Sequence, residues 1–249
     1  MFGSRIILKK GSKDEAEKPF WISYADLMTS LMVMFLVVMS VTLLTVTKKL
    51  DETLDKKEEK LKDERNKEID LVLDQISQAA SAFSEMRVDR DNHTIDFGKQ
   101  ASFRVDSYSV SLETATRLRA FTRKLLDIAR QNLGQKWIKR VVIEGYTSIE
   151  GKYLHNLNLS LNRSHRVLCV LFEQPQIDPN VLTEYELQEV RKLFLVGGYS
   201  SNSAKQSRDE SRRIELRLEF FALHDDPHEI SAEPMGELGS CKLRDELAQ

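Results

Sequence analysis

One stretch of this sequence carries no charge, although charged residues make up 31% of the chain of 249 residues. From Leu27 to Val46 every residue is uncharged, and most are apolar. About 20 such residues in helical form span the hydrocarbon core of a membrane, which is roughly 30 Å thick. A secretory signal has a shorter apolar stretch and a small-residue cleavage site, which Thr45-Val46-Thr47-Lys48 does not provide. The sequence therefore predicts one retained transmembrane helix.

The flanks of this helix place it in a membrane but do not orient it. Trp21 and Tyr24 stand at its entrance, where amphipathic rings favour the headgroup layer. Basic side chains lie on both sides, so the positive-inside rule selects no orientation. They are Arg5, Lys9, Lys10, Lys13 and Lys18 before the span, and Lys48, Lys49, Lys56, Lys57, Lys60 and Lys62 after it.

Composition divides the chain into five segments. A polar tail (1–18) and the transmembrane helix (19–47) precede a charged helical linker (48–90), in which Glu and Lys recur four residues apart. A folded domain (91–222) and a polar tail (223–249) follow. The linker also carries an apolar stripe, which needs either a second copy of the chain or the chain's own domain as its partner. The stripe is thin at Leu50, Leu54 and Leu61 and thickens at Ile69, Val72, Ile76, Ala79 and Phe83.

The periodicity of the folded domain predicts an α/β sandwich. Residues 214–220 alternate apolar and charged side chains, as a half-buried strand does. We expect further strands at 94–97, 101–105, 141–146 and 193–196, and helices at 112–128, 160–172 and 182–192. This order is βαβαβ plus a final strand, with helices on one face of a mixed sheet.

Several classes of function are disfavoured by composition. The net charge of −2 lacks the basic footprint of a nucleic-acid-binding protein. Neither the histidines nor the two cysteines show metal-ligand spacing, and no glycine-rich phosphate loop occurs. We therefore expect neither an enzyme nor a bound metal or cofactor.

Asp26 is the one ionisable residue just before the uncharged stretch. A charge inside a membrane helix costs on the order of 2.5–3.5 kcal/mol and tends to be functional. The plain alternative is an interfacial aspartate that reaches to water, because Asp26 lies only about 10 Å into a helix that starts near Pro19.

The residues around Asp26 resemble the membrane segment of the MotB family of flagellar stator proteins. The shared motif stands here as Tyr24-Ala25-Asp26-Leu27-Met28-Thr29. The resemblance implies that Asp26 carries a translocated proton, or less favourably a sodium ion, and that Tyr24, Thr29 and Ser30 line the channel or complete the motif. It also implies a polytopic MotA-like partner around a dimer of this chain, since one helix cannot form a channel.

A second resemblance lies at residues 143–171, which look like the OmpA/MotB peptidoglycan-binding signature. The matching positions are Gly145, Thr147, Asn156, Leu159, Ser160, Arg163, Val167 and Leu171, and Ser211-Arg212-Arg213-Ile214-Glu215 resembles the closing strand. The resemblance implies that Arg163 binds a ligand carboxylate and that Asn156 binds a peptide amide. Leu159 positions the groove or is plain core, and His155 lines the groove or is solvated.

One position departs from that signature. Where the family has Thr-Asp, whose acid pairs with the ammonium group of diaminopimelate, this chain has Thr147-Ser148. The binding of peptidoglycan is then weaker, directed to another feature of the stem peptide, or assisted by the nearby Glu150.

The segment from residue 16 to residue 29 is similar to the MotB-like subunits of Zorya anti-phage defence systems. That resemblance implies five copies of a MotA-like subunit of the ZorA type around two of this chain. It also implies an inner membrane location with a cytoplasmic N-terminus and a periplasmic C-terminal domain. The alternatives are a flagellar stator MotB, a passive OmpA- or Pal-like tether, and a TolR/ExbD-like energiser. An oxidising periplasm would allow a Cys169–Cys241 bridge, although Cys169 also suits a buried core position.

Overall fold

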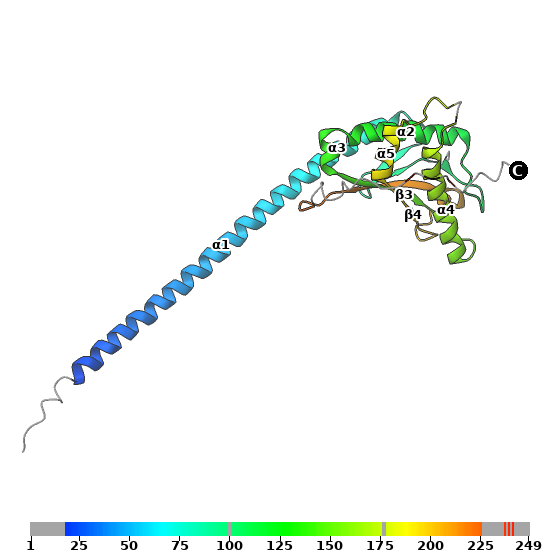
Figure 1. Ribbon diagram of the computed structural model, residues 1–249. Coiled ribbons are helices and arrows are strands. Elements are labelled where there is room, and N and C mark those ends of the chain that lie inside the picture. Colours follow the sequence, from blue (N-terminus) through cyan, green and yellow to red (C-terminus); the bar gives the residue numbers. More distant parts are fainter. Residues whose placement is uncertain are drawn as a thin grey trace, which may run out of the picture. The chain divides into compact units, whose positions relative to one another are not determined.

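A single helix of 64 residues, α1 (Lys18–Ser81), begins the described part of the chain (Figure 1). This computed structural model describes residues 18–98, 101–175 and 178–225, together with Glu237, Gly239 and Cys241. Pro19 stands in the first turn, where a helix tolerates it, and no further Pro or Gly occurs before Gly98. Nothing in the sequence therefore interrupts α1. Most of both predicted tails lies outside the described residues.

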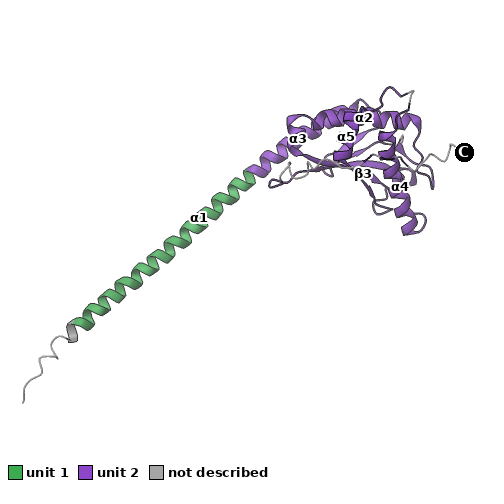
Figure 2. Ribbon diagram, viewed as in Figure 1, with its two compact units in different colours: residues 1–60 green, residues 61–249 purple. Residues whose placement is uncertain are grey.

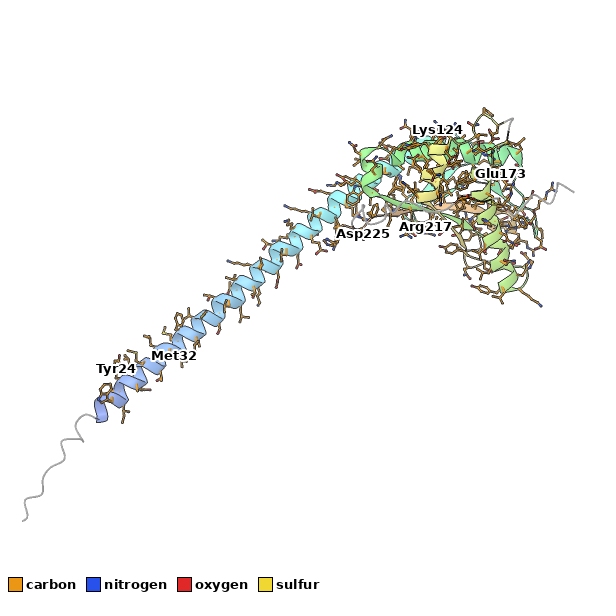
Figure 3. All side chains as sticks on the ribbon, viewed as in Figure 1. Tyr24, Met32, Lys124, Glu173, Arg217 and Asp225 are labelled. Carbon is orange, nitrogen blue, oxygen red and sulfur yellow. A yellow bond between two sulfur atoms is a disulfide. The ribbon has the colours of Figure 1, made fainter. Side chains whose placement is uncertain are left out.

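The first half of α1 contains the predicted membrane span. Among the described residues, α1 is the one helix long and apolar enough to cross a membrane. The side chains from Trp21 to Glu64 are all exposed, including Tyr24 and Met32 (Figure 3). A helix that exposes apolar side chains all round is expected in lipid or between partner helices.

The chain forms two compact units, residues 1–60 and 61–249 (Figure 2). The second unit starts well before residue 91, so the predicted domain boundary is corrected. Ile69, Val72 and Ile76 are at most 4% exposed and belong to the core of the second unit. This part of the apolar stripe therefore packs on the chain's own domain, whereas Leu50 and Leu54 stay exposed.

One mixed sheet forms the centre of the second unit, with the strand order β1-β2-β5-β3-β4. Strands β3 and β4 are parallel, and the other neighbouring pairs are antiparallel. The predicted mixed sheet is thus confirmed, with β1 as an additional edge strand. The strands are β1 (Arg87–Asp89), β2 (Thr94–Asp96), β3 (Ile138–Gly145), β4 (Phe194–Gly198) and β5 (Ile214–Phe220).

Helices α2 and α4 pack over the apolar side of this sheet (Figure 1). Val141 and Ile143 of β3 are fully buried on that side. Two helix starts are capped as their sequences require: Ser111 accepts a hydrogen bond from the backbone N–H of Thr114, and Thr183 forms a capping box with Glu186. The helices are α2 (Leu112–Ala129), α3 (Asn132–Trp137), α4 (Tyr153–Phe172), α5 (Glu184–Leu193) and α6 (Arg208–Ser211).

One predicted strand is wrong, and one predicted helix begins earlier than expected. Residues 101–105 form no strand; Ala101 and Phe103 are buried from an irregular segment, whereas Val105 is exposed. Helix α4 begins at Tyr153 rather than at residue 160. Its first two turns bury Asn156 and Ser160 instead of apolar side chains, so hydrophobic periodicity does not reveal them.

A close backbone approach joins β3 to α4. A Cβ added to Gly145 would lie 2.0 Å from the carbonyl oxygen of Ser160. The Ser160 hydroxyl in turn accepts a hydrogen bond from the backbone N–H of Ser200, at 3.0 Å. Gly145 therefore lets α4 lie directly against the end of the strand.

We predict that Gly145→Ala destabilises the second unit by about 2 kcal/mol or more, because backbone atoms must move to admit the methyl group. Gly197→Ala on the neighbouring strand is the matched control, since its nearest new contact is 3.2 Å away, on the Tyr199 ring. Thermal unfolding of the detergent-solubilised chain measures the difference. Equal melting temperatures for the two variants would contradict the prediction.

Candidate functional site

The predicted wall-binding residues gather where β3 ends and α4 begins. Tyr146, Thr147 and Ser148 follow the last residue of β3, and Asn156 and Arg163 lie on the buried side of α4. The structure thus brings together residues that the sequence separates by up to 17 positions.

Arg163 is a fully buried hub that binds backbone carbonyls. Its guanidinium donates to the carbonyl oxygens of Tyr146 at 2.7 Å, Ser107 at 2.9 Å and Arg104 at 3.1 Å. It also lies 4.8 Å from the centre of the Phe103 ring. Burial, with a smaller repulsion from Arg212, lowers the pKa of Arg163 to about 10.

Because the Arg163 side chain has no exposed surface, its visible role is to hold residues 104–107 against the end of β3. Direct contact between Arg163 and a ligand carboxylate stays a prediction.

Asn156 holds the loop that follows β3 in place, as Arg163 holds residues 104–107. Its side-chain amide donates to the carbonyl oxygens of Glu150 at 2.8 Å and Ser148 at 3.3 Å. The loop needs this support because Gly151 has a φ of +97°, a conformation that other residues rarely adopt. A Cβ at Gly151 would also come within 3.3 Å of the Asn156 amide oxygen.

Thr147 stands between Tyr146, whose carbonyl binds Arg163, and Ser148, whose carbonyl binds Asn156, and its hydroxyl has no partner. Thr147 is 2% exposed, and its Oγ1 makes no hydrogen bond. Its backbone N–H is satisfied by the carbonyl oxygen of Ser200, at 2.9 Å. A buried polar atom left unpaired costs about 1–3 kcal/mol, and such atoms commonly mark a place where water or a ligand completes the structure.

Exposed acidic groups stand at the rim of this site. Asp106 lies 2.7 Å from Nε2 of His155, and Glu150 forms an ion pair with Arg208. The hydrogen bond to Ser148, with a smaller effect of Arg208, lowers the pKa of Glu150. Sequence reasoning included His155 and Glu150 but missed Asp106, which is 49 residues from its partner.

The remaining predicted residues of the site differ in exposure. Leu159 is partly buried but does not belong to the main hydrophobic cluster, and Ser148 is half-buried. Both therefore lie near the surface of the domain, and neither position tests a contact with a ligand.

The sheet face away from α4 carries a second polar network. Glu144, although buried, accepts hydrogen bonds from Nε of Arg217 at 2.6 Å and from the Tyr146 hydroxyl at 2.7 Å. Burial and the neighbouring Glu144 carboxylate raise the pKa of Tyr146. Through its hydroxyl, the network holds the side chain of Tyr146, the residue before Thr147; Arg217 is labelled in Figure 3. The network is internally paired and offers no obvious ligand contact.

The structure joins Cys169 of α4 to Cys241 by a disulfide, with a Cα–Cα distance of 5.7 Å. His165, one turn before Cys169, lies beside the two sulfur atoms, all within 4.8 Å. The sequence spacing did not reveal this cluster of possible metal ligands. Because both sulfurs are bonded to each other, they are not available as thiolate ligands.

Asp26 belongs to the other compact unit. It is exposed, and the Thr29 hydroxyl donates to the backbone carbonyl oxygens of Ala25 and Asp26, each at 2.9 Å. These bonds satisfy Thr29 without using the Asp26 carboxylate. Asp26 and Ser30 lie about one helical turn apart on the same face of α1.

Comparison with known proteins finds a family that matches the N-terminal segment and a relative that matches nearly the whole chain. Residues 8–52 match the MotB_plug family, described as the membrane MotB of the proton-channel complex MotA/MotB. The chain is 39% identical over 248 residues to the Zorya protein ZorB of Escherichia coli O139:H28 (strain E24377A / ETEC), with 98% of each chain covered.

Solved structures overlap with the second unit at low identity. The periplasmic domain of a MotB is 15% identical, with a TM-score of 0.36, and the match covers 52% of this chain and 64% of that domain. The cell wall anchor of the T6SS from Pseudomonas aeruginosa is 16% identical, with a TM-score of 0.38, covering 60% of this chain and 97% of that one.

We predict that Asn156→Ala loosens the loop after β3, because the carbonyls of Ser148 and Glu150 lose their donor. Amide hydrogen exchange of residues 147–152 should become at least about 5-fold faster, as expected for the loss of roughly 1 kcal/mol of local hydrogen bonding. Asn158→Ala, at an exposed position on the same helix, is the control and should leave the exchange unchanged. Unchanged exchange in Asn156→Ala would show that the loop holds itself.

Proposed function

The chain belongs to the family of the Zorya protein ZorB, and from this we propose that it is the wall-anchored subunit of a proton-driven motor in the inner membrane, acting in anti-phage defence. Asp26 carries the proton, and the site between β3 and α4 binds peptidoglycan. The similarity over nearly the whole chain shows the family, and the two sites support the mechanism that we propose for it.

The proposal for Asp26 rests on its position and on the MotB-like match across residues 8–52. A carboxylate inside a membrane protein favours neutralisation, which a proton supplies. Moving one charge through 100 mV releases about 2.3 kcal/mol, enough to bias two alternative packings of a partner against α1. A sodium ion is the second choice, because the matched family is described as a proton channel.

Such a cycle requires partner chains. The apolar half of α1 is exposed all round, and the described residues contain one candidate span, which cannot enclose an ion path alone. We propose a second copy and a MotA-like polytopic subunit of the ZorA type, in the arrangement of five around two that the resemblance implies.

The wall-binding proposal is carried by the buried, unpartnered hydroxyl of Thr147. It lies among the residues of the peptidoglycan-binding signature, between loops that Arg163 and Asn156 hold in place. Two loops fixed by buried side chains form a preorganised site, which lowers the entropy cost of binding. The natural ligand of such a site in this family is the peptide stem of the cell wall.

The disulfide supports the proposed orientation. Disulfides persist in oxidising compartments such as the periplasm and are rare in the cytoplasm. A Cys169–Cys241 bond therefore favours a periplasmic second unit and a cytoplasmic N-terminus. The basic residues on both sides of the span are compatible with this orientation and do not decide it.

A passive tether and a flagellar stator are the rival functions. A passive wall anchor has no use for a carboxylate at the start of its span, which disfavours the first. The identity of 39% over almost the whole chain is to a Zorya protein, which disfavours the second.

We predict that Asp26→Asn abolishes phage protection while the protein still assembles with its partner. The amide has the shape of the protonated acid but cannot release a proton, so the cycle stops in its neutral state. Plaque counts measure protection, and co-purification with the partner measures assembly. Ser40→Ala, at another polar position of the same span, is the control and should keep protection; full protection in Asp26→Asn would refute the proton role.

We predict that the second unit reaches the periplasm. A phosphatase that folds only in the periplasm, fused after residue 222, should be active in whole cells. Alkylation of the full chain without reductant should modify neither cysteine, whereas both should react after reduction. Activity of a cytoplasmic reporter at the same position would reverse the proposed orientation.

A further inference from the structure

We propose that His165, Cys169 and Cys241 form a zinc site once the bond between the two sulfur atoms is reduced. In the oxidised chain the disulfide ties Cys241 to α4. In the reduced chain, a Zn²⁺ ion held by two thiolates and one imidazole makes the same connection. The site uses none of the residues that we assign to wall binding or to proton transfer.

Two of the three ligands come from one face of α4. His165 and Cys169 are four residues apart, so their side chains lie one helical turn apart on the same side of the helix. Cys241, which follows Cys169 by 72 positions, completes the group. One ring nitrogen of His165 and the two sulfur atoms all lie within 4.8 Å of one another.

This spacing is close to the one that a single zinc ion requires. Zn–S bonds are about 2.3 Å long and Zn–N bonds about 2.0 Å, so the ligand atoms of a tetrahedral ion lie roughly 3.5–3.8 Å apart. The Cα atoms of Cys169 and Cys241 are 5.7 Å apart. Rotation of the two cysteine side chains can therefore separate the sulfur atoms to this distance without movement of α4.

The surroundings of the three ligands favour a cation. Cys169 lies in the last turn of α4, where the partial negative charge of the helix C-terminus attracts positive charge. The guanidinium of Arg166, the residue after His165, is paired with the carboxylate of Glu173, which offsets its repulsion of a metal ion. His165 is exposed and Cys241 is partly exposed, so an ion can enter from solvent.

Reduction of the bond requires a dithiol, which transfers two electrons to the disulfide. The first thiolate of the dithiol attacks Sγ of Cys241, the more exposed sulfur, and Cys169 leaves as a thiolate. The second thiol of the reductant then attacks the first, which releases Cys241 as a thiolate and leaves the reductant as a disulfide. Zn²⁺ binds both thiolates, and any protons that they have taken up pass to solvent.

The ligand set selects the kind of metal ion. Two thiolates and an imidazole suit Zn²⁺, whereas Ca²⁺ and Mg²⁺ need oxygen ligands. Three protein ligands leave the fourth tetrahedral position to water. The zinc ion would thus keep Cys241 on α4 under conditions that remove the disulfide.

The test measures Zn²⁺ binding by the full-length, detergent-solubilised chain, which is reduced with dithiothreitol and then desalted without oxygen. A zinc salt is titrated in competition with a chromogenic chelator, and melting temperatures are recorded with and without zinc. The wild type is compared with His165→Ala, which removes an exposed ligand. His224→Ala is the matched control, because His224 is also exposed but does not belong to the cluster.

We expect the reduced wild type and His224→Ala to bind one Zn²⁺ ion, which protects both cysteines from alkylation and raises the melting temperature. His165→Ala should bind zinc at least about 10-fold more weakly, since even the loss of a residue that only supports a ligand costs 10–100-fold in metal affinity. The oxidised wild type should not bind zinc through the two sulfur atoms. Equal zinc affinity of the reduced and oxidised wild type, equal affinity of His165→Ala and the reduced wild type, or an unchanged melting temperature of the reduced wild type would each overturn the proposal.

Discussion

The buried guanidinium of Arg163 is the interaction on which the ligand end of the domain depends. A charge without exposed surface is costly unless its donors are satisfied, and here three backbone carbonyls satisfy them. Those carbonyls belong to two segments far apart in the sequence, residues 104–107 and the residue after β3. The guanidinium therefore joins segments that apolar contacts alone would leave mobile. A lysine at this position would offer a point charge in place of a planar fork and could not align with all three acceptors in the same way.

The packing of α4 makes this arrangement possible. The helix buries small polar side chains where it meets the strand end, and Gly145 allows the backbone of Ser160 to approach it directly. Ser160 then holds Ser200, whose carbonyl oxygen binds the backbone of Thr147. A helix with larger apolar residues at these positions would lie farther from the sheet, and the guanidinium would no longer reach the Tyr146 carbonyl. The polar face that obscures the start of α4 in the sequence is thus what brings the helix close to the strand.

The sequence predicted what depends on periodicity and missed what depends on distant pairing. The uncharged stretch, the alternation at residues 214–220 and the helix at 112–128 each follow from local patterns, and the structure contains all three. The early start of α4 was missed because its buried side chains are polar, and β1 because a strand of three residues is too short for a period. The burial of Arg163 and the approach of Asp106 to His155 could not be predicted from spacing, since both depend on a loop 49 or more residues away. The signature predicts a ligand site in this region, and the structure shows that Arg163 and Asn156 hold backbone carbonyls there.

The two units differ in how their charged side chains are paired. The second unit satisfies its buried ionisable groups internally, as Arg119 with Asp178 and Arg217 with Glu144 show. Asp26 has no such partner among the described residues of its own chain, although it begins a helix that is apolar for the next twenty positions. In a membrane, an aspartate in that state must be neutralised or must meet a polar partner on another chain. On the function proposed above, the described buried charges of the second unit are paired within the chain, whereas Asp26 depends on a partner that another chain would supply.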